Sequence, residues 1–195
     1  TTPAIATSTV GNYAIVAARG GLTSTNYDFQ FVNAILTINQ AVVTVTPDNQ
    51  STAYGDDIPV LSVTYIGFAN GETSTSGILT GSPDVATTAT KASGIGAYPI
   101  VATAGTLSAQ NYSFFFTNGQ LTINRAILKV TANNVSKTYG SANPDITGYT
   151  ISGYKNGEET ATNIVTGSPV ASTLVTNNTA VGTYPITLVP GTLSA

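Results

Sequence analysis

The residues that decide the fold form a segment that occurs twice, 85 positions apart. Residues 96–124 read GAYPIVATAGTLSAQNYSFFFTNGQLTIN, and residues 11–39 read GNYAIVAARGGLTSTNYDFQFVNAILTIN. Aromatic residues occupy every second position of each NYxFxF run, and aliphatic residues alternate with polar ones in each LTI run. Because successive side chains of a β-strand point to opposite faces, this pattern predicts half-buried strands. The repetition predicts a tandem-repeat architecture.

Other motifs extend this repeat over the whole chain with a period of 85 or 86 residues. The copies follow one another without a Gly/Pro-rich linker, which favours an elongated, semi-rigid rod over loosely connected domains. The recurring motifs are Tyr-Gly (54–55 and 139–140), Gly-Ser-Pro (81–83 and 167–169) and Tyr-Pro-Ile (98–100 and 184–186).

The offsets divide the chain into three parts. Residues 1–39 are the C-terminal part of a first repeat, residues 40–124 are a complete repeat, and residues 125–195 are the N-terminal part of a third repeat. The first part contains the NYxFxF and LTI runs that the last part lacks. One interpretation is that one chain donates its first segment to the last part of another chain by strand addition. The alternative is that these limits only reflect where the segment was cut. The expected strand-donor residues are Tyr27, Phe29, Phe31, Leu36 and Ile38.

Short strands with Gly and Pro between them predict an all-β fold. The favoured architecture is a tandem array of β-sandwich-like (immunoglobulin-like) repeats. The alternative is a β-grasp-like mixed repeat with one short helix, for which residues 158–165 are the candidate. Asn118-Gly119, between two alternating runs, predicts a type I′ hairpin turn, because both turn residues need positive φ.

The composition excludes several classes of function. Charged residues make up 8% of the chain and the net charge is −3, so no basic surface is available for nucleic acid. No apolar run approaches the roughly 20 residues that span a bilayer, so we expect no membrane insertion. The chain has no His and no Cys, which removes the common nucleophile–base pairs and most metal ligands. We therefore predict that the chain is not an enzyme.

The remaining candidates for a binding site are acidic pairs and tyrosines. Asp56-Asp57 is a conceivable but weak calcium site, and the aligned residues of the next copy are Ser141 and Ala142. We therefore expect no cofactor and interpret these carboxylates as solvated loop charges. Tyr54 and Tyr139 occupy the same place in two copies and are expected to be buried rings rather than glycan-stacking residues. Tyr27 and Tyr112 are expected in the core, whereas Lys129 is expected to face solvent.

Six motifs in fixed order make the chain similar to a known family. A strand is followed by the Tyr-Gly step, Gly-aromatic-x-Asn-Gly-Glu (67–72 and 153–158), Thr-Gly-Ser-Pro, Gly-x-Tyr-Pro-Ile, NYxFxF and LTI. This order resembles the MBG domain of the YGX type over essentially the whole chain. The resemblance implies an extracellular, mostly β repeat from large bacterial surface proteins, and it transfers no catalytic residue.

These observations lead to two functional hypotheses. The first is a structural stalk or filament repeat of a bacterial cell-surface adhesin, in contact with neighbouring repeats of the same protein and able to self-associate. The second is a carbohydrate- or mucin-binding module that recognises host or matrix glycans. An exposed aromatic and polar patch repeated in each copy would favour the second hypothesis.

Overall fold

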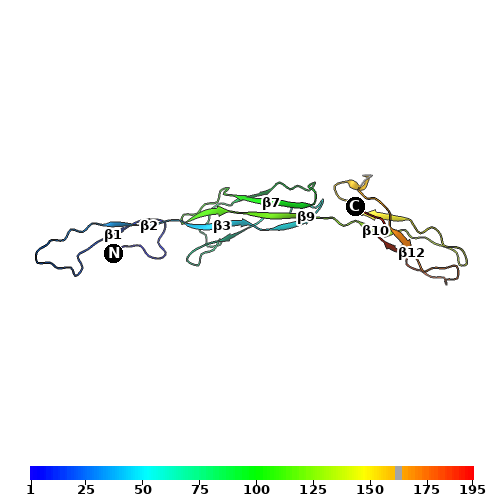
Figure 1. Cartoon of the computed structure of the whole chain (residues 1–195), viewed down its shortest axis with the longest axis horizontal. Helices are drawn as coiled ribbons and strands as arrows, with labels where there is room; N and C mark the ends of the chain where they lie inside the picture. Colours follow the sequence, from blue (N-terminus) through cyan, green and yellow to red (C-terminus); the bar gives the residue numbers. More distant parts are fainter. Residues whose placement is uncertain (161–163) are drawn as a thin grey trace. The chain divides into compact units, whose positions relative to one another are not determined.

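The computed structural model describes residues 1–160 and 164–195 and consists of β-strands joined by turns (Figure 1). Its one helical element among the described residues is a single 3-10 turn, η1 (Glu158–Thr160). The described residues include no helix that is long and apolar enough to cross a membrane. The predicted all-β class is therefore confirmed.

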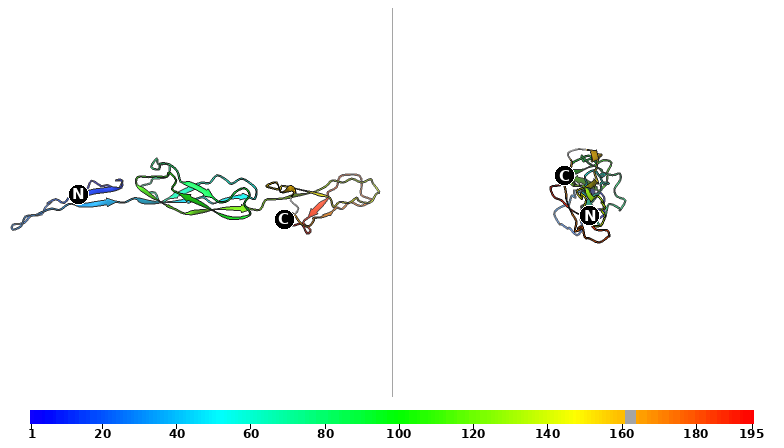
Figure 2. Two further views of the ribbon diagram at one scale, coloured as in Figure 1. Left: turned by 90° about the horizontal axis from the view of Figure 1, so that it is seen from above. Right: turned by 90° about the vertical axis from the view of Figure 1, so that its right-hand side faces the viewer.

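The complete repeat contains seven strands in two sheets. One sheet has three strands in the order β5-β3-β8, and the other has four strands in the order β4-β9-β7-β6. Figures 1 and 2 show that these strands, parallel and antiparallel, are aligned along one axis. The strands are β3 (Ala41–Pro47), β4 (Gln50–Ala53), β5 (Val63–Ile66), β6 (Asp84–Thr87), β7 (Gly96–Thr103), β8 (Tyr112–Phe116) and β9 (Asn118–Asn124).

Strand β3 is the centre of the three-stranded sheet. It pairs antiparallel with β5, from Thr44↔Ile66 to Pro47↔Val63. It pairs parallel with β8, from Ala41↔Tyr112 to Val45↔Phe116. A parallel pair requires a long connection, and here the rest of the repeat forms that connection. The sheet is therefore mixed, as in the alternative architecture, while the helix of that alternative is reduced to η1 among the described residues.

The core lies between the two sheets and uses alternate positions of their strands. β3, β7 and β9 each contribute aliphatic side chains that are almost completely buried. These residues occupy every second position, because successive side chains of a strand point to opposite faces. β8 adds the ring of Tyr112, which is 3% exposed, as the sequence predicted. The other core residues of the strands are Val43, Val45, Pro47, Ile100, Ala102, Leu121 and Ile123.

The predicted hairpin turn at Asn118-Gly119 is wrong. Both residues lie within β9, and neither has a positive φ. β8 and β9 belong to different sheets, so the chain crosses from one sheet to the other through Thr117, whose N–H donates to the Val45 carbonyl at 3.1 Å. A glycine is needed because a Cβ at Gly119 would lie 3.0 Å from the carbonyl carbon of Pro47 and closer still to its oxygen.

The first part of the chain forms a two-stranded antiparallel sheet. β1 (Gly11–Ile15) pairs with β2 (Ala34–Ile38), in register from Gly11↔Ile38 to Ile15↔Ala34. The strand predicted at residues 27–31 is wrong, because this run has no regular structure. Its counterpart β8 pairs with β3, and the described part of residues 1–39 offers no strand in the place of β3. Alternation alone does not form a strand when its pairing partner is missing.

The last part of the chain forms two separate antiparallel pairs. β10 (Lys129–Ala132) pairs with β11 (Tyr149–Ser152), and β12 (Val170–Ser172) pairs with β13 (Thr187–Val189). The short helix predicted over residues 158–165 begins as η1, and residues 161–163 lie outside the described part of the chain.

The chain packs into two compact units whose limits differ from those of the sequence repeat. The first unit comprises residues 1–51, 59–89 and 97–122. The second comprises residues 52–58, 90–96 and 123–195. Two loops of the complete repeat therefore belong to the same unit as the repeat that follows.

Candidate functional site

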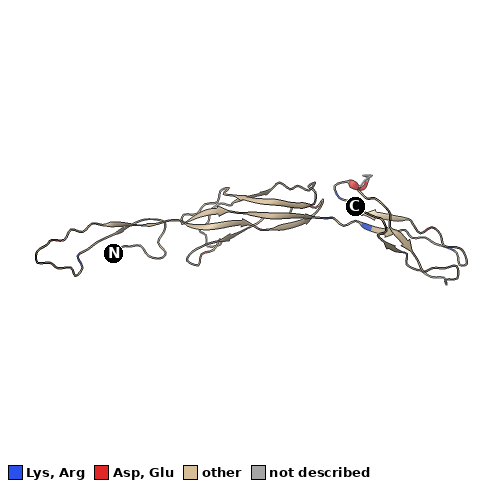
Figure 3. Ribbon diagram, in the orientation of Figure 1, with Lys and Arg blue, Asp and Glu red and all other residues tan. Residues whose placement is uncertain are grey.

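Charged residues are sparse on the strands of this protein, as the colouring of the ribbon in Figure 3 illustrates. Asp84 is the only charged residue in the seven strands of the complete repeat, every residue of which the structure describes. No group of three His, Cys, Asp or Glu residues that could hold a metal ion occurs in the described ranges. The two ion pairs of the described residues, Lys91–Asp57 and Lys155–Asp56, lie in loops.

The five expected strand-donor residues are accessible and lie in two places. Tyr27 is 79% exposed, so the prediction that it belongs to the core is wrong. Phe29 and Phe31 are partly exposed and stack at 6.3 Å, with the Arg19 guanidinium 6.0 Å from the Phe29 ring. Leu36 and Ile38 lie on β2, paired with β1.

A turn with the sequence Asn-Gly occurs at equivalent positions in both repeats. Asn70 and Gly71 have φ values of 54° and 73°, and Asn156 and Gly157 have φ values of 53° and 76°. Two successive positive φ values are those of a type I′ turn, which Asn-Gly favours. Each turn presents a glutamate immediately after its glycine.

In the complete repeat this glutamate is held by a tyrosine of the same repeat. The Tyr112 hydroxyl donates to the Glu72 carboxylate and accepts a hydrogen bond from the Ala69 N–H at 3.0 Å. The hydrogen bond to Glu72 and, after it, burial raise the pKa of Tyr112. Tyr112 therefore connects β8 to the turn at its side.

In the second unit the equivalent glutamate is held by the Tyr-Gly turn. The Tyr54 hydroxyl donates to Oε1 of Glu158 at 2.5 Å. Nearby, Nζ of Lys155 lies 2.6 Å from Oδ1 of Asp56, and both of these side chains are partly exposed. The two contacts join residues that are about a hundred positions apart in the sequence, 104 and 99 respectively.

A close backbone approach accompanies these contacts. Gly55 has a φ of 78°, and a Cβ at this position would lie 2.7 Å from Cγ of Lys155 and closer still to its Cβ. A glycine is therefore required here for two reasons, its backbone conformation and the space that Lys155 occupies.

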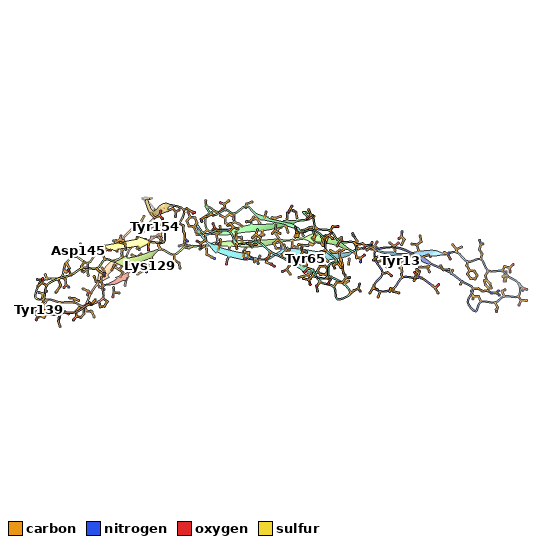
Figure 4. All side chains as sticks on the ribbon, turned by 180° about the vertical axis from the view of Figure 1, so that it is seen from behind. Tyr13, Tyr65, Lys129, Tyr139, Asp145 and Tyr154 are labelled. Atoms are coloured by element: carbon orange, nitrogen blue, oxygen red, sulfur yellow. The ribbon has the colours of Figure 1, made fainter. Side chains whose placement is uncertain are left out.

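A cleft of about 550 Å³ lies beside this contact, within the second unit. Its walls combine apolar groups with the charged ends of Arg125, Lys155 and Glu158. Tyr154, which Figure 4 labels with Lys129 of the same region, also lines it. The remaining lining residues are Tyr54, Ile95, Ala126, Leu128, Gly153, Ile164 and Ala195.

The tyrosine predictions are only partly correct. Tyr54 is half-buried, but its hydroxyl meets a carboxylate rather than the backbone. Tyr139, labelled in Figure 4, is 62% exposed, so the prediction that it is buried is wrong. Lys129 is exposed as predicted. Asp57 forms an exposed ion pair with Lys91 at 3.1 Å, and Asp56 contacts Lys155, so the acidic pair is divided between two lysines.

Sequence reasoning missed the role of Glu158 and Lys155. A signal for Glu158 was present, because Tyr-Gly and Asn-Gly-Glu both recur in the two repeats. No such signal existed for Lys155, whose counterpart is Ala69, or for its partner Asp56, whose counterpart is Ser141. These two residues differ between the copies and meet only in the folded chain.

The arrangement of consecutive β-sheet repeats defines a tandem structural module. The family model of the MBG domain (YGX type) matches residues 43–122 and 128–194. The chain therefore belongs to the YGX-type MBG-domain family. This family is a structural repeat module of large bacterial extracellular surface proteins. Neither the curated proteins nor the solved structures include a match to the chain.

Proposed function

We propose that this chain is a spacer: a stalk or filament segment that holds the adhesive part of a bacterial surface protein away from the cell. The observation that carries the proposal is the pair of consecutive family segments, in which loops of the complete repeat pack in one unit with the repeat that follows. A spacer needs connected, self-supporting repeats and no catalytic groups. Stability in such arrays adds up from each repeat and from its contacts with its neighbours.

The low charge of the strands supports the same function. When the surface consists mainly of hydroxyl and amide groups, few ionisable groups are coupled to folding. The free energy of unfolding should therefore change little with salt or pH. An extracellular spacer meets such changes. We assign the chain no catalytic role and no cofactor.

A display experiment tests the spacer function. The 195-residue chain is inserted between a cell-wall anchor and a peptide epitope on a bacterial surface. We expect the inserted chain to increase binding of a bulky antibody conjugate to the epitope, compared with a flexible Gly/Ser linker of equal length, which forms a compact coil. Equal accessibility with both inserts would contradict the proposal.

The second candidate function is glycan recognition, and one observation favours it. Tyr139 presents an exposed ring at the same motif in which Tyr54 is half-buried, and aromatic rings with a polar end are common in binding surfaces. A glycan and mucin array probed with the intact chain separates the two functions. Saturable binding that Tyr139→Ala abolishes would establish the binding module, whereas a spacer gives no specific signal.

A further inference from the structure

The Tyr-Gly turn occurs twice with the same backbone and with different surroundings. Gly55 and Gly140 have φ values of 78° and 83°. Lys155 fills the space beside Gly55, but no atom of the described structure lies within 4 Å of a Cβ placed on Gly140. The Gly140 N–H donates to the Asn177 carbonyl at 3.2 Å, but the face of Gly140 that a Cβ would occupy is open. This open face is a surface that a second loop can occupy.

The loop that occupies this surface at Gly55 is the Asn-Gly-Glu turn of residues 153–158. Its shape is set by its own sequence, since the Glu158 N–H donates to the Lys155 carbonyl at 3.0 Å across Asn156-Gly157. The turn at residues 67–72 has the same closure, from the Glu72 N–H to the Ala69 carbonyl at 2.9 Å. Both surfaces of the contact are thus preformed in each repeat.

We propose that the Tyr-Gly turn of one repeat is the docking site for the Asn-Gly-Glu turn of the following repeat. This inference rests on the proposed spacer function and adds to it the residues that join successive repeats. Tyr54 supplies a hydroxyl donor to the Glu158 carboxylate, and Gly55 supplies the close approach. The occupant of the exposed turn at Tyr139-Gly140 is another Asn-Gly-Glu turn of this family.

The contact has one part shared by all copies and one part specific to this pair. Tyr, Gly and Glu recur in both repeats, so the tyrosine–glutamate hydrogen bond can form at each junction. The ion pair is specific, because Ser141 replaces the acid in one copy and Ala69 replaces the base in the other. Opposite charges present on only one pair of turns favour the correct neighbour over other copies.

Zero-length cross-linking with a carbodiimide tests this contact in the intact chain. The reagent joins a carboxylate to an amine in direct contact, and the product is an amide with loss of water. We expect peptide mass spectrometry to find Asp56 linked to Lys155, with the pair Asp57–Lys91 as an internal positive control. Asp56→Asn must abolish the first link and retain the second.

Isotope mixing identifies the source of the partner turn. Unlabelled and fully labelled chains are cross-linked together, and links within one chain carry a single isotope composition. We expect only such links. Mixed links would show that the turn docks onto a second copy, and absence of the Asp56–Lys155 link beside a normal Asp57–Lys91 link would overturn the proposal.

Hydrogen exchange tests the part of the contact that does not depend on the ion pair. We expect Tyr54→Phe and Glu158→Gln to accelerate amide exchange in residues 153–158 by about tenfold, as for a lost hydrogen bond to a charged group. The double variant should exchange no faster than the single variants. Tyr13→Phe is the matched control, because the Tyr13 hydroxyl bonds the Thr9 carbonyl at 2.7 Å in the first part of the chain.

Failure of docking and failure of the spacer function give different results. If exchange is unchanged in Tyr54→Phe and in Glu158→Gln, the docking proposal is wrong, but epitope display by the folded chain is unaffected. If docking is present and the display experiment fails, the contact joins repeats that have another function.

Discussion

Strands β3 and β10 carry nearly the same pattern of residues but differ in burial. Val45 of β3 is fully buried, whereas Val130, its counterpart 85 positions later in β10, is half-buried. β3 pairs with strands on both sides, and its side chains Val43, Val45 and Pro47 are fully buried. Among the described residues β10 pairs only with β11. An aliphatic strand therefore forms a core only when segments about 70 residues away in sequence pack against it.

The largest expected effect is a difference between two identical substitutions. Val45→Ala should lower the free energy of unfolding of the complete repeat by about 2–3 kcal/mol, because it removes two buried carbons and leaves a cavity. Val130→Ala should lower stability by less than about 1 kcal/mol, since this side chain is half-buried. Urea unfolding, followed by tyrosine fluorescence and by exchange of β3 and β10 amides, measures both. Equal effects would contradict the comparison.

The next effect concerns the crossing from β8 to β9. Gly119→Ala places a methyl group against the backbone of Pro47, and we expect a loss of about 1–2 kcal/mol, as in overpacked cores. The matched control is Gly21→Ala, where the added methyl group meets no atom within 4 Å and no positive φ is disturbed. Thermal unfolding of the two variants is compared, and a normal midpoint for Gly119→Ala would show that β8 and β9 do not cross as described.

A smaller effect should appear at alkaline pH. The folded-state pKa of Tyr112 is raised, so its contribution to stability is complete below the unfolded pKa of about 10 and is lost as pH rises above it. Tyr112→Phe removes the hydroxyl, so its stability should decline less between about pH 10 and 12. Urea midpoints at a series of pH values measure this. Parallel curves for the two proteins would exclude the effect.

The smallest effect distinguishes the two repeats at acidic pH. The hydroxyls of Ser62 and Thr64 each donate to the Asp48 carboxylate at 2.6 Å and lower its pKa. Its contribution is therefore present above the unfolded pKa of about 3.9 and is lost as pH falls through the folded value. The counterpart of Asp48 is Asn133, which does not titrate.

In Asp48→Asn, the free energy of unfolding of the complete repeat should accordingly fall less as the pH is lowered. Amide exchange in β10 and β11 should be unchanged. The following repeat has its own acid-sensitive group, because Thr147 donates to Asp145 and lowers its pKa. Asp145→Asn is the reciprocal control. If the free energy of unfolding of Asp48→Asn falls with pH as steeply as that of the parent protein below about pH 4, Asp48 makes no contribution to acid stability.

The sequence predicted the elements whose signals are local. The period identified equivalent positions in the repeats, and alternation located β8 and the C-terminal half of β9. The Gly-aromatic-x-Asn-Gly-Glu motif contained the residues of a true type I′ turn. These features depend on neighbouring residues, so a linear pattern is sufficient to find them.

The errors arose where distant contacts decide the conformation. Asn118-Gly119 has the composition of a hairpin turn, but Pro47 and Val45 hold this segment as a crossing between two sheets. Residues 27–31 have the pattern of a strand without a strand beside them. The Asp56–Lys155 contact spans 99 positions and involves residues that the copies do not share, so repetition did not reveal it.

The parallel pairing of β3 with β8 has a mechanical consequence. β3 begins the repeat, and β8 continues through Thr117 into β9, which ends it. A force that pulls the two ends apart draws β3 toward its N-terminus and β8 toward its C-terminus, so the two strands slide against each other. Their hydrogen bonds are then loaded together instead of opening one by one. The same topology that closes the core therefore makes the repeat resistant to stretching.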